Sequence, residues 1–339
     1  MPDVLELFNS ETVLNYMNNR QLKPLIGETL FPEVKHETLD FSYLVGASSL
    51  PVIASVHAFD TEAEIGSREA AKQALEAAYI KRKMQITEKD LIALQFPRTQ
   101  GEQQYLMGQV FNDIDKLVAG VKARVELMRM EALSTGKVTL DENGLNMTVN
   151  YRVPEEHQET LSGTDLWTDP NADIIGDLES WQNSLDEKAT RALTSTKVLT
   201  QILRNSKIIG YLFGTDSGRI PTRQDLNAFL QQHDLPQIAV YDSKYRKQEA
   251  NGKYTTHRYL AENKFVMFGD GTLGETLYGP TPEESRMIRE GANVSTVGKV
   301  IAMVYEEGKD PISTWTKAAA TAIPSFPEAN NVFQAQPIA

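Results

Sequence analysis

Six residues in the second half of the chain match a glycine-rich pattern that binds dinucleotides in other proteins. Gly269-Asp270-Gly271-Thr272-Leu273-Gly274 fits G-x-G-x-x-G and follows the strand-like run KFVMF. In that pattern the third glycine opens a helix whose N-terminus holds the pyrophosphate. Here Gly279-Pro280 follows and would end such a helix after barely one turn. We interpret Gly269, Asp270, Gly271 and Gly274 as part of a contact loop, with a nucleotide-dependent enzyme as the alternative.

Other residue types that perform catalysis are absent or scattered. The chain has no cysteine, which excludes disulfides, thiolate metal sites and a cysteine nucleophile. No two histidines have the three- or four-residue spacing that places imidazoles on one helix face; they are His36, His57, His157, His233 and His257. No nucleophile elbow, phosphate loop or metalloprotease helix is present. We therefore expect no catalytic, cofactor or metal site, and no enzyme.

One tight basic cluster, Lys81-Arg82-Lys83, lies in the run AYIKRKMQI, which alternates in polarity like a strand. One interpretation is an edge strand that its charges protect from aggregation. The other is a basic binding site for an acidic neighbouring molecule, which suits a chain of net charge −12. The sequence alone leaves both open.

Composition limits the class of protein. The chain has 339 residues, of which 41% are hydrophobic and 24% charged, values typical of a globular protein with a buried core. At about 150 residues per domain the length suggests two domains. The acidic balance excludes a generally basic coat for nucleic acid. The acidic start and the lack of a long apolar run predict neither a signal peptide nor a membrane span, and so cytosol-like conditions.

The first hundred residues predict a helix, an arm and a projecting excursion. Residues 10–18 form a short helix capped by Ser10, and an extended arm with little contact to its own chain follows it. Strands at 51–57 and 78–86 are joined by about twenty polar residues, a length that compact domains seldom tolerate without a use for it. Within them, the Ala- and Glu-rich stretch 67–77 is helix-like.

The strongest element is a long helix over residues 100–134. Apolar residues recur there at three- and four-residue steps, and Gly136 follows as a stop signal. Asn143-Gly144 between two alternating runs then predicts a hairpin over 137–151.

The remainder mixes helices and strands without regular βαβ spacing, which predicts an α+β protein. Helices are expected at 172–185, at 197–205, from Pro221 as first helical residue, and from Thr281 to Gly291. Strands are expected at 191–193 and 264–268, with 237–242 and 254–259 paired around Asn251-Gly252. The segment from Pro324 is expected to wrap a surface.

The order of these parts resembles the tailed-phage major capsid fold, often called Hong Kong 97-like, and the chain resembles the phage major capsid protein E family. The likeness covers nearly the whole chain and includes short sequence segments as well as the order of parts. It is found at FPEVKHETLDFSYLVG, AYIKRKMQI, Gly136-Lys137, Asn251-Gly252, Gly269, Arg289-Glu290-Gly291 and Gly308-Lys309-Asp310-Pro311.

The resemblance implies an arrangement of parts. These are an N-terminal arm (1–45), an E-loop (46–95), a P domain with spine helix and hairpin (96–169), an A domain (170–305) and a C-terminal segment returning to the P domain (306–339). It implies that Ile80, Lys81, Arg82 and Lys83 lie at a subunit interface and that the Gly269 loop makes A-domain contacts. The helix-like stretch 67–77 departs from the Gly- and Ser-rich tip that the family leads us to expect.

The implied function is structural: the major building block of an icosahedral head shell that encloses the double-stranded DNA of a tailed phage. The implied partners are the protein itself in pentamers and hexamers, a scaffolding protein, a portal and a decoration protein, with DNA contacted only non-specifically and no membrane. The implied location is the virion, after assembly in the host cytoplasm. The alternative within the same fold is an encapsulin-like nanocompartment shell.

Overall fold

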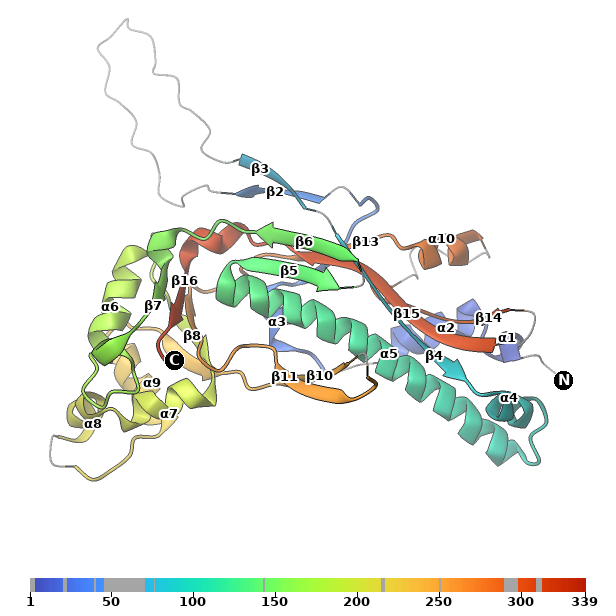
Figure 1. Cartoon of the computed structure of the whole chain (residues 1–339), viewed down its shortest axis with the longest axis horizontal. Coiled ribbons are helices and arrows are strands. Elements are labelled where there is room, and N and C mark those ends of the chain that lie inside the picture. Colours follow the sequence, from blue (N-terminus) through green and yellow to red (C-terminus); the bar gives the residue numbers. More distant parts are fainter. Residues whose placement is uncertain are drawn as a thin grey trace, which may run out of the picture. The chain divides into compact units, whose positions relative to one another are not determined.

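The computed structural model describes residues 4–20, 23–39, 41–45, 71–75, 77–142, 144–214, 217–249, 251–289, 298–308 and 313–339 (Figure 1). The chain divides into two compact units. The first contains Met1–Phe41, Leu75–Glu126 and Glu275–Pro324, and the second Ser42–Ala74, Leu127–Gly274 and Ser325–Ala339. Among the described residues, no helix is both long and apolar enough to cross a membrane.

A five-stranded sheet organises the first unit. Its strands are β1 (Glu33–Lys35), β4 (Ala78–Ile86), β13 (Thr276–Gly279), β14 (Ile301–Glu307) and β15 (Ser313–Pro324). β15 pairs antiparallel with β4 along one edge, and with β14 and then β13 along the other. β1 adds to β13 in parallel. The predicted strand 78–86 is confirmed residue for residue, but its partner is the distant β15.

The N-terminal segment is more ordered than expected and packs on its own chain. It contains α1 (Val4–Leu7), α2 (Ser10–Asn19) and α3 (Ile26–Leu30). α2 is confirmed, but its cap is Asn9, whose side-chain oxygen accepts the Thr12 N–H at 2.8 Å, so the expectation for Ser10 is wrong. The expectation of an arm with little contact to its own chain is also wrong, because Leu30 and Phe31 are buried and β1 is a sheet strand.

The long helix α5 runs from Gln100 to Thr135, within one residue of the prediction. Its apolar stripe is buried; the buried members include Val110, Ile114, Leu117, Val118, Val121, Val125, Met128 and Ala132. Gly136 ends it with φ +65°, and a Cβ there would lie 2.7 Å from Val153 Cγ2, so only glycine fits. The hairpin of β5 (Lys137–Glu142) and β6 (Leu145–Asn150) follows as predicted.

The second unit is built on another five-stranded sheet, ordered β7-β16-β12-β8-β9. Its strands are β7 (Gln158–Thr160), β8 (Arg191–Thr194), β9 (Gln237–Val240), β12 (Phe265–Phe268) and β16 (Val332–Gln336). The helices of this unit are α6 (Ile174–Ser184), α7 (Thr196–Arg204), α8 (Ser206–Phe213) and α9 (Arg223–Gln232).

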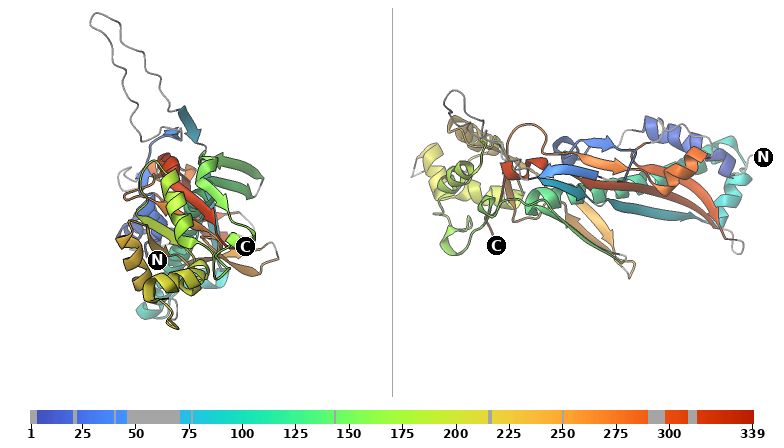
Figure 2. Two further views of the ribbon diagram at one scale, coloured as in Figure 1. Left: turned by 90° about the vertical axis from the view of Figure 1, so that its left-hand side faces the viewer. Right: turned by 90° about the horizontal axis from the view of Figure 1, so that it is seen from above.

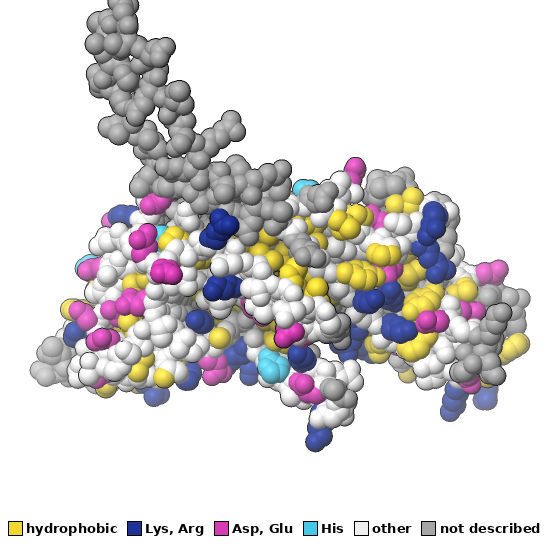
Figure 3. Space-filling view, turned by 45° about the horizontal axis from the view of Figure 1, so that its top comes forward, with side chains coloured by type: hydrophobic (Ala, Val, Ile, Leu, Met, Phe, Trp, Pro, Cys, Tyr) yellow, Lys and Arg dark blue, Asp and Glu magenta, His cyan; other side chains and the backbone are white. Residues whose placement is uncertain are grey.

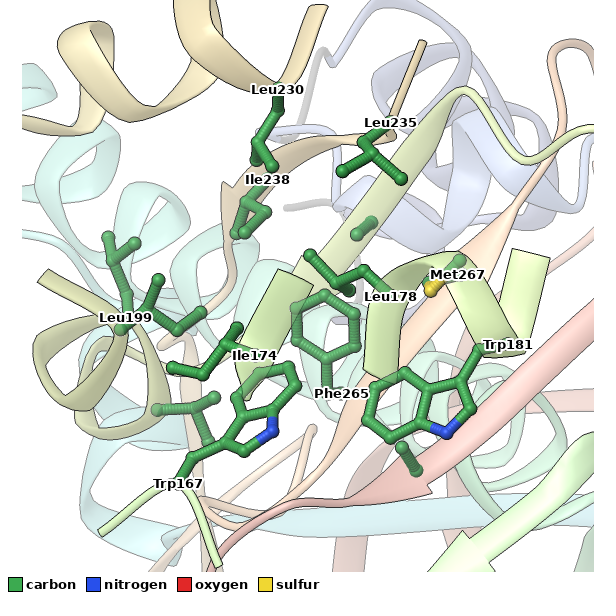
Figure 4. Close-up of a cluster of buried hydrophobic side chains, with 14 of the residues drawn as sticks. Trp167, Ile174, Leu178, Trp181, Leu199, Leu230, Leu235, Ile238, Phe265 and Met267 are labelled. Carbon is green, nitrogen blue, oxygen red and sulfur yellow. The ribbon is translucent and has the colours of Figure 1, made fainter. Parts of the chain in front are cut away.

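Aromatic rings fill the core of this second unit (Figure 4). Trp167 and Trp181 stack with ring centroids 5.4 Å apart, and Phe265 meets the Trp167 ring edge-on at 5.1 Å. The Trp167 indole N–H donates to Asp177 Oδ2 at 2.8 Å, and that of Trp181 donates to Glu159. Both indoles are thus buried with their polar atoms satisfied.

Three expectations for the second unit are wrong. β9 pairs in parallel with β8, while β11 (Tyr254–Arg258) pairs with β10 (Lys244–Gln248). α9 begins after the Thr222 cap, so Pro221 precedes the helix. The C-terminal segment does not wrap a surface, because β16 lies inside the sheet between β7 and β12. The capping box of Thr222 sets the start of α9, and pairing with the distant strand β12 makes the C-terminal segment a strand.

Parts of the predicted excursion are described and parts are not. The strand expected at 51–57 lies outside the described residues. The helix-like reading of 67–77 is wrong at residues 71–75, which form β3 (Ala71–Leu75) paired with β2 (Phe41–Val45). Pairing with a partner strand overrides the helix propensity of alanine here. The Gly291 end expected for α10 (Pro282–Arg289) also lies outside the described residues.

Replacing a buried valine of α5 tests the core of the first unit. Val121→Asp places a carboxylate where the side chain is 1% exposed, which costs several kcal/mol against a total stability of about 5–15 kcal/mol. We expect insoluble protein in the pellet after expression. Ala119→Asp, on the exposed face two residues earlier, is the control and should stay soluble. Soluble, folded Val121→Asp would contradict the assigned stripe.

Candidate assembly surfaces

Strand β4 carries the predicted basic cluster along an edge of the first unit's sheet. It pairs with β15 on one side, and no other described strand pairs with it. Lys81, Arg82 and Lys83 are exposed, while Ile80 is half-buried. Free backbone N–H and C=O groups along such an edge can pair with another chain, and lysines discourage uncontrolled pairing.

Lys83 is held by its own sheet. Its ammonium lies 3.1 Å from Glu307 Oε2 and 4.0 Å from the centroid of the Trp315 ring. The bond to Glu307 raises the pKa of Lys83 above its ordinary value, although desolvation opposes it. Lys81 lies over the Tyr79 ring at 5.0 Å. The partners shown for these two lysines therefore come from the same chain, and an intersubunit role for the cluster stays a prediction.

The face of β4 that bears Arg82, opposite the face of Lys81 and Lys83, lies toward the long helix α5. The Arg82 Cδ lies 3.8 Å from the position that a Cβ on Gly120 would take, which is ordinary van der Waals contact. The small Gly120 leaves room for the arginine stem to cross the helix surface. Arg82 thus packs across α5, on the face of β4 away from Lys81 and Lys83.

Buried charges fix helix α10 to the same sheet. The Tyr79 hydroxyl donates to Glu283 Oε1 at 2.5 Å, and Lys317 pairs with the same carboxylate. Lys35 pairs with Glu284 at 2.7 Å. Burial alone would raise the pKa of Glu283, but its bonds to Lys317 and Tyr79 outweigh burial and lower it. Burial and the adjacent Glu283 raise the pKa of Tyr79. Glu283 therefore stays ionised and paired.

The Gly269 loop, in the second unit, is folded against its own chain. Arg191 donates from Nε and Nη2 to the Gly269 carbonyl at 3.0 and 2.6 Å, and from Nη2 to the Gly271 carbonyl at 2.7 Å. Thr190 Oγ1 donates to Asp270 Oδ1 at 2.6 Å. A Cβ on Gly274 would lie 2.2 Å from the Ser325 carbonyl oxygen. Gly274 is therefore needed for this packing.

No helix follows the glycine motif, since the next element is strand β13. The phosphate-binding geometry that the pattern requires is therefore missing. Within the described residues no three His, Asp or Glu side chains are grouped to hold a metal ion. His157 is buried, with Nε2 3.0 Å from the Ser184 carbonyl oxygen, which is a structural contact.

The sequence reasoning missed two exposed features. One is the corner between α4 (Glu88–Gln95) and α5, where Ile92, Phe96 and Tyr105 are 61%, 65% and 64% exposed. The other is the ribbon of β10 and β11, which begins Lys244-Tyr245-Arg246-Lys247 and stands clear of its unit's sheet (Figure 2). The run KYRK beside Asn251-Gly252 was the signal that could have found it.

These exposed features are candidate contact surfaces. A family model described as phage major capsid protein E matches residues 9–336. The chain belongs to this family. It is therefore a phage major capsid protein, and the family match decides against the nanocompartment alternative.

Solved structures show the same fold at low identity. A protein assigned as the capsid protein of a prophage of Escherichia coli CFT073 has a TM-score of 0.66 and 18% identity, over 98% of this chain and 99% of that one. A phage-related protein from Bordetella bronchiseptica RB50 has a TM-score of 0.56 and 12% identity, over 96% of each chain. A search of curated proteins found no match to this chain. The predicted α+β capsid fold is thus confirmed.

Three glycine substitutions test the structural role of the Gly269 loop. Gly269→Ala has room, so stability should not change. Gly271→Ala meets no atom, but φ +89° should cost about 1–2 kcal/mol. Gly274→Ala meets fixed backbone and should cost about 3 kcal/mol or more. Urea unfolding followed by circular dichroism measures the order. Saturable NAD binding in calorimetry, lost in Gly271→Ala, would restore the enzyme alternative.

A charge swap tests whether Lys83 acts within its own chain. Lys83→Glu faces Glu307 with like charge, so we expect a small decrease in the melting temperature of the unassembled subunit. Adding Glu307→Lys should restore it, and Lys81→Glu is the matched control on the same face. A melting temperature unaffected by Lys83→Glu would show that the pair contributes nothing within the subunit.

Proposed function

We propose that the capsid protein assembles with copies of itself into a closed icosahedral shell that encloses the double-stranded DNA of a tailed phage. The family match over residues 9–336 carries this proposal. The open edge of β4, the exposed corner at Ile92 and Phe96, and the β10–β11 ribbon support it physically. Each would be covered when copies associate, and weak contacts repeated over a shell add up to avidity.

We further propose that the shell is made of pentamers and hexamers, with the family's division of the chain into arm (1–45), E-loop (46–95), P domain (96–169), A domain (170–305) and C-terminal segment (306–339). The two compact units cut the chain differently. Residues 275–324 belong to the first unit and 325–339 to the second. The family's parts thus describe roles in assembly, whereas the units describe packing within the subunit.

The remaining parts of the proposal concern partners and location. A scaffolding protein would guide assembly of a precursor shell, which expands as DNA enters, and a portal and a decoration protein would bind the finished shell. DNA must slide during packaging, and a chain of net charge −12 would not hold its phosphates tightly. Contact with DNA would therefore be weak and non-specific. The protein would assemble in the host cytoplasm and end in the virion, with no catalytic activity, cofactor or membrane.

Particle formation tests this function. The full chain, expressed alone and with the scaffolding protein of its own phage, should yield closed particles or five- and six-subunit capsomers. Sedimentation and negative-stain microscopy measure them. A monodisperse monomer at every protein and salt concentration, with and without scaffold, would contradict the proposal.

A further inference from the structure

The β10–β11 ribbon lacks the support that strands usually have. Its two strands pair with each other through five residue pairs, and with no other described strand. Nearly every residue of both strands is exposed, and only Tyr245 and Arg258 are half-buried. A two-stranded ribbon is marginally stable in water without a covering surface. The face bearing Lys244 and Arg246 is the one open to a partner, because Lys247 on the other face pairs with Glu142 of β5 at 2.8 Å.

Charge distinguishes the two faces. Residues 244–258 contain five Lys or Arg and one acid, a net charge of +4 in a chain of net charge −12. The register places Lys244 directly opposite Arg258, and Arg246 on the same face. Like charges directly opposite destabilise a strand pair. Asp242 and Glu262 pair with Arg258, but no described acid pairs with Lys244 or Arg246.

The ribbon's aromatic rings are occupied by its own side chains. The Arg246 guanidinium lies 4.5 Å from the Tyr254 ring centroid. Tyr245 packs on His257 and Tyr259 with centroids 5.6 and 5.1 Å away. Tyr245 is thus engaged within the chain, and Tyr254, which is 50% exposed, already has Arg246 against its ring. Lys244 and Arg246 are left as the groups that can meet a partner.

An acidic segment in the same unit complements the ribbon. Residues 155–187 contain ten Asp or Glu and no Lys or Arg. Several of these acids already have structural bonds, such as Asp177 to Trp167. Others are exposed side chains; they are Glu155, Glu156, Asp165, Glu179 and Glu187. Each copy therefore presents a cationic ribbon and a segment without basic residues, two surfaces of complementary charge that suit a head-to-tail contact between copies.

We propose that the face of the β10–β11 ribbon bearing Lys244 and Arg246 binds the acidic segment 155–187 of a second copy of this chain in the shell. This inference rests on the proposed shell function. Duplex DNA is a less suitable partner. Lys and Arg side chains are scattered among acids over the face in Figure 3 and form no continuous basic surface there, and the net charge of −12 repels phosphate.

Zero-length crosslinking identifies the contact directly. Particles assembled from mixed ¹⁵N-labelled and unlabelled subunits are treated with a carbodiimide, which joins lysine amines to carboxylates, and analysed by mass spectrometry. We expect Lys244 to be coupled to a carboxylate within 155–187 in light–heavy pairs, which come from different copies. Lys244→Arg keeps the charge and should assemble but lose the crosslink. Coupling of Lys244 only to carboxylates elsewhere, or no coupling between copies, would overturn the proposal.

Charge reversal tests whether the contact matters for assembly. Lys244→Glu with Arg246→Glu should leave circular dichroism unchanged and lower the shell yield at low salt by about ten-fold or more, with partial recovery at high salt. Lys197→Glu with Arg204→Glu, two exposed positions of α7, makes the same change in net charge and should assemble normally.

The outcomes separate this inference from the shell function. Normal shell yield from the ribbon variant would overturn the ribbon contact alone, whereas wild-type protein that forms no shells would overturn the function. An electrophoretic shift of duplex DNA by wild-type subunits, abolished in the ribbon variant while its shells form normally, would assign the ribbon to DNA and overturn the proposed contact.

Discussion

Strand β15 is bonded on both edges, and the first unit depends on this double pairing. Nine of its residues pair with β4, more than two hundred positions earlier, while β14 and β13 share the other edge. Ala318, Ala319 and Ala320 are completely buried at its centre. Lys317 on the same strand holds Glu283 of α10. Loss of β15 would therefore release its three paired strands, β4, β13 and β14, the anchor of helix α10 and, through β13, strand β1.

The central strand of this sheet is paired on both edges, whereas its outer strands keep backbone groups that no other described strand pairs with. β4 is paired on one edge only, and in the second unit β10 and β11 pair only with each other among the described residues. Large apolar side chains such as Ile92 and Phe96 remain in water. A protein that acts alone gains nothing from these surfaces, whereas in the proposed shell neighbouring copies would cover them. Family membership and surface chemistry thus point to the same function.

Local signals predicted some elements well. The period of α5, the glycine at 136 and the Asn-Gly turn each act within a few residues, so the helix and the β5–β6 hairpin were placed almost to the residue. The absence of a helix after the Gly269 motif was also predicted, because Gly279-Pro280 left no room for one, and the structure has strand β13 there. These judgements needed no knowledge of distant partners.

Elements that depend on distant partners were missed. β16 contains VFQAQ near the C-terminus and becomes a strand through β12 and β7, which lie far away in the sequence. β3 is rich in alanine and is a strand only because β2 pairs with it. Lys81-Arg82-Lys83 is the tightest basic cluster in the sequence, but its Lys83 already has a partner in its own chain, which the sequence does not show. Non-local pairing and side-chain neutralisation are invisible to a local pattern.

Hydrogen exchange compared between free subunits and assembled shells tests whether assembly covers the open edges of β4 and of the β10–β11 ribbon, because it reports which backbone amides become protected. We expect amides of β10–β11 and of the open edge of β4 to exchange more slowly in shells, and those of the buried strand β12 to exchange equally slowly in both states. Equal exchange of the ribbon and the β4 edge in both states would contradict this expectation.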